Sequence, residues 1–238
     1  MKMRKIEKVG ASIADSQANL SVLGVFQVVE NAVTEHFGAW QLDNVNLKRK
    51  YNAAWVFTKN RIRRLKDIPW NGEFHTESFL SSVTNAAVHV DVAIRNAARE
   101  LCAYARVEMC MLDLQTGRIR KIGSLELGEV LTTEPPEAEI AFTKFGSEAL
   151  SEVGQVRVKY TCVDFSHHTN NVEYVRFILD TYSVQALEAR PIREMQVSYA
   201  HQSYENDVLT IRKGCFGDKD LFLLQKEDQT IVRSEIVF

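Results

Sequence analysis

The sequence predicts an α+β fold in which one unit, a helix followed by an antiparallel meander, occurs twice. Two observations support this prediction. A helical segment followed by several short alternating or β-branched segments appears once before residue 131 and again after residue 150. The 238 residues are 45% hydrophobic and 25% charged, which is typical of a folded chain with one large domain or two modest ones.

The first unit begins with the segment 20–38, LSVLGVFQVVENAVTEHFG, whose apolar residues recur close to every 3.6 positions. Gly38 follows as a stop signal, so we predict one helix here. Four segments rich in β-branched or alternating residues come next and are separated by turn sequences. We predict strands within residues 53–66, 72–83, 86–97 and 100–113.

Residues 132–150, TTEPPEAEIAFTKFGSEAL, interrupt this pattern with paired prolines, several glutamates and no sustained periodicity. We predict a linker here. The predicted domains are therefore residues 1–131 and 151–238, joined by the linker 132–150.

The second unit repeats the order of the first. An amphipathic segment, 170–187, is followed by predicted strands within residues 192–202, 207–216, 220–227 and 230–238. Asp15 precedes the first predicted helix as Asp164 precedes the second, an offset of 149 residues. This short match suggests an internal duplication.

Composition also narrows the classes of function. The four cysteines form no CxxC pair, which favours a reduced compartment, and no segment has the roughly 18 apolar residues of a membrane span. We therefore expect a cytoplasmic protein without a membrane partner. A net charge of −2 gives no global attraction to nucleic acid. No metal-ligand spacing, phosphate-binding glycine loop or serine-hydrolase elbow occurs, so we expect no metal or cofactor.

A polar cluster, DFSHHTNN, lies directly before the second helix at residues 164–171. Thr169 and Asn170 suit the capping of a helix amino terminus. Capping explains Asp164 and His168 less well, because a carboxylate and an imidazole four residues apart at a helix start are the parts of a hydrolytic site. The free amides of the first turn can also hold a developing oxyanion.

The full pattern here, D-x-S-x-H-x-N-N-x-x-Y, resembles D-x-N-x-H-x-N-N-x-x-Y of the acyl-acyl-carrier-protein (acyl-ACP) thioesterases. The segments AAWVFTKNRIRRLKDIPWNGE and VSYAHQSYENDVL also resemble segments of that family. The resemblance implies two tandem hot-dog domains, each a long helix wrapped by an antiparallel sheet. It also implies hydrolysis of the fatty acyl thioester of acyl carrier protein to free fatty acid, which terminates fatty acid synthesis.

The resemblance assigns the catalytic acid to Asp164 and the catalytic histidine to His168. This sequence departs from the family pattern at Ser166, where asparagine is usual, and at Gln202-Ser203, where the family has glutamate and cysteine. A cysteine nucleophile is therefore excluded at that place. We expect Asp164 to accept a proton from water, with His168 and Ser166 orienting the water or the carboxylate.

Two further roles follow from the resemblance. Gln202 is expected to polarise the thioester or hold the water. Asn171 is expected either to act in catalysis, where the helix amides meet the thioester oxygen, or to be a structural clasp. The first unit has Asn19 where the second has His168, so we expect the N-terminal domain to bind the acyl chain instead. Its apolar strand residues could line an acyl tunnel or form ordinary core: Trp55, Phe57, Phe79, Val88 and Val90.

The basic run from Lys59 to Lys66 is the strongest local positive charge, with Lys48, Arg49 and Lys50 upstream. An acidic carrier protein is expected to bind such a surface, which makes Arg61, Arg63, Arg64 and Lys66 candidate carrier-binding residues. The alternative is an edge strand protected by charge.

Two other functions stay open at this point. One is a hot-dog thioesterase acting on acyl-coenzyme A, and the other is a non-catalytic acyl-binding protein that has lost its base at Gln202. The sequence does not determine the oligomeric state, and a homodimer is one candidate.

Overall fold

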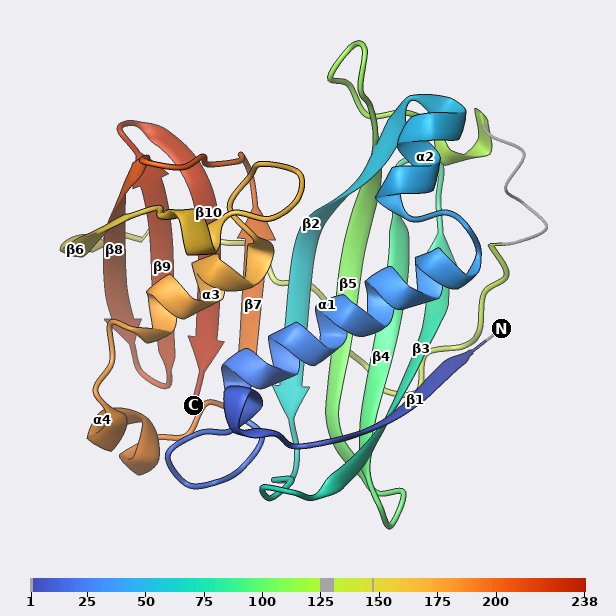
Figure 1. Ribbon diagram of the computed structural model, residues 1–238. Helices are drawn as coiled ribbons and strands as arrows, with labels where there is room; N and C mark the ends of the chain where they lie inside the picture. Colours follow the sequence, from blue (N-terminus) through green and yellow to red (C-terminus); the bar gives the residue numbers. More distant parts are fainter. Residues whose placement is uncertain (1, 125–130, 147) are drawn as a thin grey trace. The chain divides into compact units, whose positions relative to one another are not determined.

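The computed structural model describes residues 2–124, 131–146 and 148–238 of the chain (Figure 1). It divides into two compact units, Met1–Ala141 and Phe142–Phe238. The division falls inside the segment predicted as a linker. Residues 125–130, at the end of the predicted first domain, and Ser147, within the predicted linker, lie outside the described residues.

The N-terminal unit is one antiparallel sheet with a long helix across one face (Figure 1). Its strands follow the order β1-β3-β4-β5-β2. The helix α1, Val22–Ala39, is preceded by the short 3-10 helix η1, Ala11–Ile13, and followed by α2, Asn44–Tyr51. The strands are β1 Met3–Lys8, β2 Ala53–Arg64, β3 Glu73–Val83, β4 Val88–Asn96 and β5 Leu101–Asp113, and a second 3-10 helix, η2, covers Ile122–Ser124.

The predicted helix over 20–38 is α1. It begins after Ser21, whose hydroxyl accepts a hydrogen bond from the Gly24 amide at 2.8 Å and so caps the first turn. A side chain at Gly24 would lie 2.5 Å from the Ile13 carbonyl, so the approach of η1 to α1 requires glycine. The apolar stripe of α1 is buried through Val25, Phe26, Val28, Val29, Val33 and Phe37.

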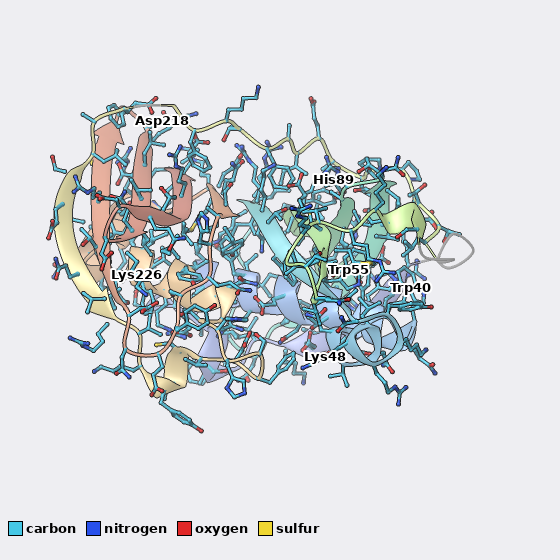
Figure 2. The ribbon with its side chains drawn as sticks, turned by 90° about the horizontal axis from the view of Figure 1, so that it is seen from above. Trp40, Lys48, Trp55, His89, Asp218 and Lys226 are labelled. Atoms are coloured by element: carbon cyan, nitrogen blue, oxygen red, sulfur yellow. The ribbon has the colours of Figure 1, made fainter. Side chains whose placement is uncertain are left out.

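An aromatic cluster closes the end of α1. The ring of Phe37 lies 5.6 Å from that of Trp40 and 5.2 Å from that of Trp55, both in edge-on geometry. Figure 2 shows these two tryptophans together in the N-terminal unit. Of the predicted tunnel residues, Trp55 therefore faces the helix. Phe79 faces the other side of the sheet, because β3 pairs it with Asp91 of β4.

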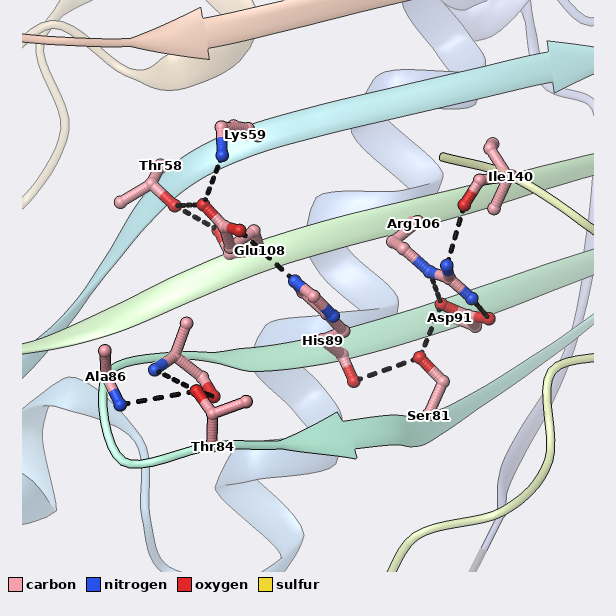
Figure 3. Close-up of polar contacts among 11 residues, drawn as sticks. Thr58, Lys59, Ser81, Thr84, Ala86, His89, Asp91, Arg106, Glu108 and Ile140 are labelled. Atoms are coloured by element: carbon pink, nitrogen blue, oxygen red, sulfur yellow. Dashed lines mark hydrogen bonds and ion pairs between the residues drawn. The ribbon is translucent and has the colours of Figure 1, made fainter. Parts of the chain in front are cut away.

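The sheet face opposite α1 carries a buried ion pair at Asp91 (Figure 3). This fully buried carboxylate accepts hydrogen bonds from Ser81, from the Tyr104 hydroxyl at 2.6 Å, and from two guanidinium nitrogens of Arg106 at 2.7 Å each. Arg106 also donates to the Ile140 carbonyl at 2.7 Å. The buried pair thereby holds the extended segment ahead of Ala141 against its own sheet.

The C-terminal unit repeats this plan with a sheet in the order β7-β10-β9-β8-β6. Its helices are α3, Asn171–Leu179, and α4, Val184–Ala189, with the 3-10 helix η3, Tyr160–Cys162, ahead of them. The strands are β6 Ser151–Arg157, β7 Glu194–Tyr199, β8 Val208–Phe216, β9 Lys219–Lys226 and β10 Gln229–Val237. Among the described residues, no helix is long and apolar enough to cross a membrane.

The structure differs from the prediction of one helix over 170–187. The chain leaves the helix after Leu179 and starts α4 only after Ser183, whose hydroxyl caps the new helix. Between them the Tyr182 hydroxyl donates to buried Asp220 at 2.6 Å, and its ring packs on Phe222. Continuing α3 would withdraw Tyr182 from this buried partner, so the tertiary contact favours the break.

Two strands were not predicted, β1 and β6. Both are edge strands of their sheets, and only alternate residues of β1 are partly buried. Charged side chains suit an edge strand because they discourage pairing with other chains, but the same charges hide the strand from a search for apolar alternation.

Candidate active site

The polar cluster forms a tight loop between η3 and α3. Val163 and Thr169 pair as an antiparallel bridge at the base of the loop. At its tip the Asp164 amide donates to the His168 carbonyl at 2.9 Å, and the His167 amide donates to the Asp164 carbonyl at 3.0 Å. His167 adopts a left-handed backbone with φ of 65°, which reverses the chain. The loop therefore brings Asp164 and His168 to the same end.

The side chains of the loop form a chain of hydrogen bonds. Ser166 donates to Asp164 Oδ1 twice, from its backbone amide at 2.8 Å and from its hydroxyl at 2.5 Å. Ser166 Oγ lies 3.1 Å from His168 Nδ1. Because the hydroxyl proton is donated to the carboxylate, Ser166 Oγ accepts from His168 Nδ1–H. This assigns the Nδ1–H tautomer to the neutral imidazole, in which Nε2 carries no proton.

The amino terminus of α3 adds hydrogen-bond donors beside this loop. Asn170 caps the helix, because its side chain accepts from the Val172 amide at 2.8 Å and its carbonyl accepts from the Glu173 amide at 3.0 Å. The backbone amide of Asn171 has no acceptor among the residues that the structure describes. It is therefore available to a ligand at the positive end of the helix dipole.

Ser203 is not at the surface of the site but beneath it. Its side chain is 0% exposed, and its hydroxyl lies 2.7 Å from Thr169 Oγ1 and 2.8 Å from the Tyr174 hydroxyl. Its carbonyl also accepts from the Thr169 amide at 2.9 Å. Ser203 thus has a structural role, because it connects its own segment, residues 200–207, to the loop and to α3.

Sequence reasoning missed one residue that touches the site, Tyr204. Its ring lies 5.1 Å from the ring of His168, at an interplanar angle of 65°. The Tyr204 amide donates to Asp207 at 2.9 Å, and Asp207 forms an ion pair with Lys226 at 2.8 Å. The sequence signal was weak, a single aromatic residue in a polar loop. Gln202 lies two positions before Tyr204 with an exposed side chain.

The predicted carrier-binding residues already have partners inside the N-terminal unit. Arg61 is buried and donates to the Ala141 carbonyl at 3.0 Å, and Arg63 donates to the Glu139 carbonyl at 3.1 Å. Arg64 pairs with Asp67 at 3.0 Å, and Lys66 pairs with Glu100 at 2.6 Å. Because β2 ends at Arg64, Lys66 lies beyond the strand.

The C-terminal unit is similar to a known family. Residues 147–236 match the family model of the acyl-ACP thioesterase C-terminal domain. The chain is 20% identical over 173 residues to oleoyl-acyl carrier protein thioesterase 2, chloroplastic, of Arabidopsis thaliana, covering 68% of this chain and 47% of the relative. It is 24% identical over 177 residues to the palmitoyl-acyl carrier protein thioesterase, chloroplastic, of the same plant, covering 70% and 43%. The chain thus spans less than half the length of these curated relatives.

Solved structures of similar proteins share the fold over the whole chain. An acyl-ACP thioesterase from Bacteroides thetaiotaomicron aligns with a TM-score of 0.88 at 18% identity, covering 100% of this chain and 97% of that one. The 12:0-ACP thioesterase from Umbellularia californica aligns with a TM-score of 0.85 at 15% identity, covering 99% and 96%. The predicted α+β fold with two tandem hot-dog units is confirmed.

Proposed function

The chain is a relative of the acyl-ACP thioesterases and has their tandem hot-dog fold, and from this premise we propose that it hydrolyses the thioester of fatty acyl-ACP. The observation that carries the proposal is the hydrogen-bonded chain from Asp164 through Ser166 to His168 at the amino terminus of α3. A carboxylate, an imidazole and a helix amide in one place supply a base, an orienting group and an oxyanion donor.

In the proposed reaction Asp164 is the general base. Ser166 occupies Oδ1 and so orients the carboxylate, while the described residues place no donor on Oδ2. Oδ2 accepts a proton from water as the water oxygen attacks the thioester carbon. His168 Nε2, unprotonated in the assigned tautomer, accepts the second hydrogen of the same water and holds it in line.

The leaving group completes the proton balance. As the C–S bond breaks, the sulfur leaves as a thiol with the proton that Asp164 took from water, and the acyl group leaves as free fatty acid. The free amide of Asn171 stabilises the oxyanion of the tetrahedral intermediate. The carboxamide of Gln202 cannot act as a base, so we assign it to hydrogen bonding with the water or the thioester.

The remaining assignments complete the proposal. Acyl carrier protein bearing a fatty acyl-phosphopantetheine thioester is the partner, and release of the acid terminates fatty acid synthesis. The N-terminal unit binds the acyl chain, using the strand face that carries Trp55 and packs on α1.

Parallel hydrolysis assays with acyl-ACP and the matching acyl-coenzyme A thioesters test the function. We expect turnover of acyl-ACP with a kcat/KM at least about tenfold above that of the coenzyme A thioester, because a carrier protein adds contacts that a nucleotide lacks. Asp164→Asn is the matched inactive control. Equal or better turnover of the coenzyme A thioesters would assign the enzyme to that substrate class, and no turnover of either would leave an acyl-binding protein.

A further inference from the structure

An exposed basic surface lies at the α2 end of the N-terminal unit. It consists of Lys48, Arg49 and Lys50 on α2 with Arg118 and Lys121 after β5, and we call it the α2 patch. Within the part of the chain that the structure describes, none of these five side chains forms an ion pair with a carboxylate. Figure 2 labels Lys48 in this region of the molecule.

Two hydrogen bonds to backbone carbonyls, one from a backbone amide and one from a guanidinium, make the α2 patch one continuous surface. The Leu114 amide donates to the Asn52 carbonyl at 3.0 Å, directly after α2. Arg120 donates to the Tyr51 carbonyl at 2.6 Å, which joins the returning segment to the last turn of α2. Figure 1 shows α2 beside the end of β5 where this hairpin emerges. Cations distant in the sequence therefore face solvent from adjoining segments.

Two carboxylates close to the α2 patch in the described part of the chain, Asp43 and Asp113, do not neutralise it. Asp43 is engaged as the cap of α2, accepting from the Val45 amide at 2.9 Å and the Asn46 amide at 3.1 Å. Asp113 holds its own turn through the Thr116 amide at 2.9 Å, and it lies 3.8 Å from Arg120, which is not one of the five. Among the described residues the α2 patch is thus locally positive, on a chain of net charge −2.

Exposed apolar side chains lie among these cations. Val45 of α2 is 68% exposed, and Ile119 and Leu114 of the hairpin are 61% and 40% exposed. Apolar contacts within a charged rim are the composition of a protein-binding surface. Nucleic acid would use the charges but gain less from branched aliphatic side chains presented between them.

We propose that the α2 patch docks the acidic helical carrier protein that delivers the acyl thioester; this inference rests on the proposed function. Arg49 and Lys50 donate only to the neutral amide oxygens of Asn46 and Gln41, so among the described residues the patch keeps its positive charge to steer and hold an acidic helix. By contrast, the basic side chains between Arg61 and Lys66 already form hydrogen bonds with backbone carbonyls, or ion pairs with carboxylates, of their own unit. The proposed carrier-binding surface is therefore α2 with its neighbouring hairpin, in place of β2.

The test neutralises the α2 patch in the full chain with Lys48→Ser, Lys50→Ser, Arg118→Ser and Lys121→Ser together. The matched control is Lys8→Ser with Arg99→Ser, two exposed cations of the same unit outside the α2 patch. A third variant, Arg64→Ser with Lys66→Ser, tests the alternative surface. Because all of these side chains except the partly buried Arg64 are exposed, thermal unfolding should be nearly unchanged in the first two variants.

Steady-state kinetics with acyl-ACP and with a short acyl-pantetheine thioester separate docking from chemistry. We expect the patch variant to raise KM for acyl-ACP at least about tenfold at low salt, with a smaller effect near 0.2 M salt because ions screen exposed charges. The pantetheine thioester should be hydrolysed at the wild-type rate. The Lys8/Arg99 control should match wild type on both substrates.

A binding measurement distinguishes this inference from the proposed function. Titration of each variant with carrier protein bearing an amide-linked, non-hydrolysable acyl chain needs no turnover. If the wild type binds the carrier and the patch variant loses at least about tenfold in affinity, the surface stands even if hydrolysis is never observed. Wild-type affinity in the patch variant, loss confined to the Arg64/Lys66 variant, or tighter binding to anionic vesicles or RNA than to the carrier would each overturn the inference.

Discussion

Two loops of this chain have the same backbone conformation but different side-chain chemistry. They are residues 14–20 ahead of α1 and residues 163–169 ahead of α3. Ala14 pairs with Leu20 as Val163 pairs with Thr169, so each bridge closes at the same 149-residue offset. The 3-10 helices that precede the loops, Ala11–Ile13 and Tyr160–Cys162, keep that offset too. The duplication suggested by Asp15 and Asp164 therefore extends through the local backbone.

The hydrogen bonds at the two loop tips also correspond. The Asp15 amide donates to the Asn19 carbonyl at 2.8 Å, as the Asp164 amide donates to the His168 carbonyl at 2.9 Å. Ala18, with φ of 58°, stands in the left-handed position that His167 occupies in the second loop. Neither turn depends on glycine, so the surrounding fold holds the left-handed residue in both units.

The side chains separate the two loops. Among the described residues, the hydrogen bonds to Asp15 Oδ1 come from backbone amides alone, those of Gln17 at 3.0 Å and Asn19 at 2.9 Å, which makes Asp15 a turn cap. Asp164 Oδ1 instead accepts the Ser166 hydroxyl, which connects it to His168. The same backbone turn therefore serves structure in one unit and a candidate proton-transfer site in the other, and the difference lies in two side chains.

The largest expected difference between the loops is in turnover. Asp164→Asn and His168→Ala should each lower kcat for acyl-ACP by at least about 100-fold, since both groups contact the attacking water in the proposed reaction. The corresponding changes Asp15→Asn and Asn19→Ala should leave kcat within about twofold. Steady-state kinetics on folded variants, verified by circular dichroism, measures both. Near-normal turnover of either second-loop variant would remove the catalytic assignment.

The residues beneath the loops offer a second contrast, buried Ser203 against buried Ile68. The Leu20 amide donates to the Ile68 carbonyl at 2.8 Å, as Thr169 does to Ser203, but only Ser203 adds a hydroxyl. Ser203→Ala should cost about 2 kcal/mol of unfolding free energy, because it leaves the Thr169 and Tyr174 hydroxyls short of a partner. Denaturant titration measures this loss.

The same burial predicts that Ser203 is not a nucleophile. Rapid-quench mass spectrometry during turnover of acyl-ACP should show unmodified protein, because an attacking hydroxyl would have to leave both of its partners and reach the surface. A kinetically competent acyl adduct on Ser203 would contradict the water mechanism. It would also mean that the residue beneath the second loop is a nucleophile, which Ile68 beneath the first loop cannot be.

Tyr204 should contribute a smaller effect through His168. Tyr204→Ala should lower kcat about tenfold and move the pH profile of kcat, because the edge-on ring restrains the imidazole, whereas Tyr204→Phe should stay close to wild type. Tyr160→Ala is the control, since Tyr160 is an exposed tyrosine that makes no ring contact with His168 among the described residues. An unchanged pH profile in Tyr204→Ala would show that the contact is incidental.

The smallest effect concerns α1, which is longer than α3 and carries a buried histidine. Burial lowers the pKa of His36 from its usual 6.5 to about 4. Between pH 6.5 and pH 4 the unfolded chain binds a proton at His36 that the folded chain excludes. The contribution of neutral His36 to the free energy of unfolding is therefore fully present above pH 6.5 and falls as the pH decreases towards 4. We expect a loss of about 1 kcal/mol between pH 7 and 5.5 from this group.

Tryptophan fluorescence can follow this loss in one unit alone, because all three tryptophans, Trp40, Trp55 and Trp70, belong to the N-terminal unit. Denaturant titrations at pH 7 and 5.5 should show a smaller pH dependence in His36→Gln than in wild type. His201→Gln, a change at an exposed histidine, should keep the wild-type pH dependence. The same pH dependence in His36→Gln and wild type would assign the effect to other groups.

The sequence by itself determined the repeated plan and the loop of the candidate site. The 3.6-residue periodicity of α1, the alternation in the strands and the run from Asp164 to Asn171 all depend on neighbours close in the chain, which is why they can be read without the fold. The offset between Asp15 and Asp164 also lies in the sequence, and it anticipated the pair of equivalent turns.

Only the tertiary structure decided features that depend on partners distant in the chain. The break after Leu179 needs Asp220 as the partner of Tyr182, and the side of the sheet on which Phe79 lies needs the register between β3 and β4. The contact of Tyr204 with His168 joins residues 36 positions apart. In the sequence, Arg61 and Lys48 are both simply positive charges, and nothing near them in the chain shows which one has a partner. The fold alone pairs Arg61 with a backbone carbonyl and leaves Lys48 facing solvent, because burial and hydrogen-bond geometry are properties of the packed chain.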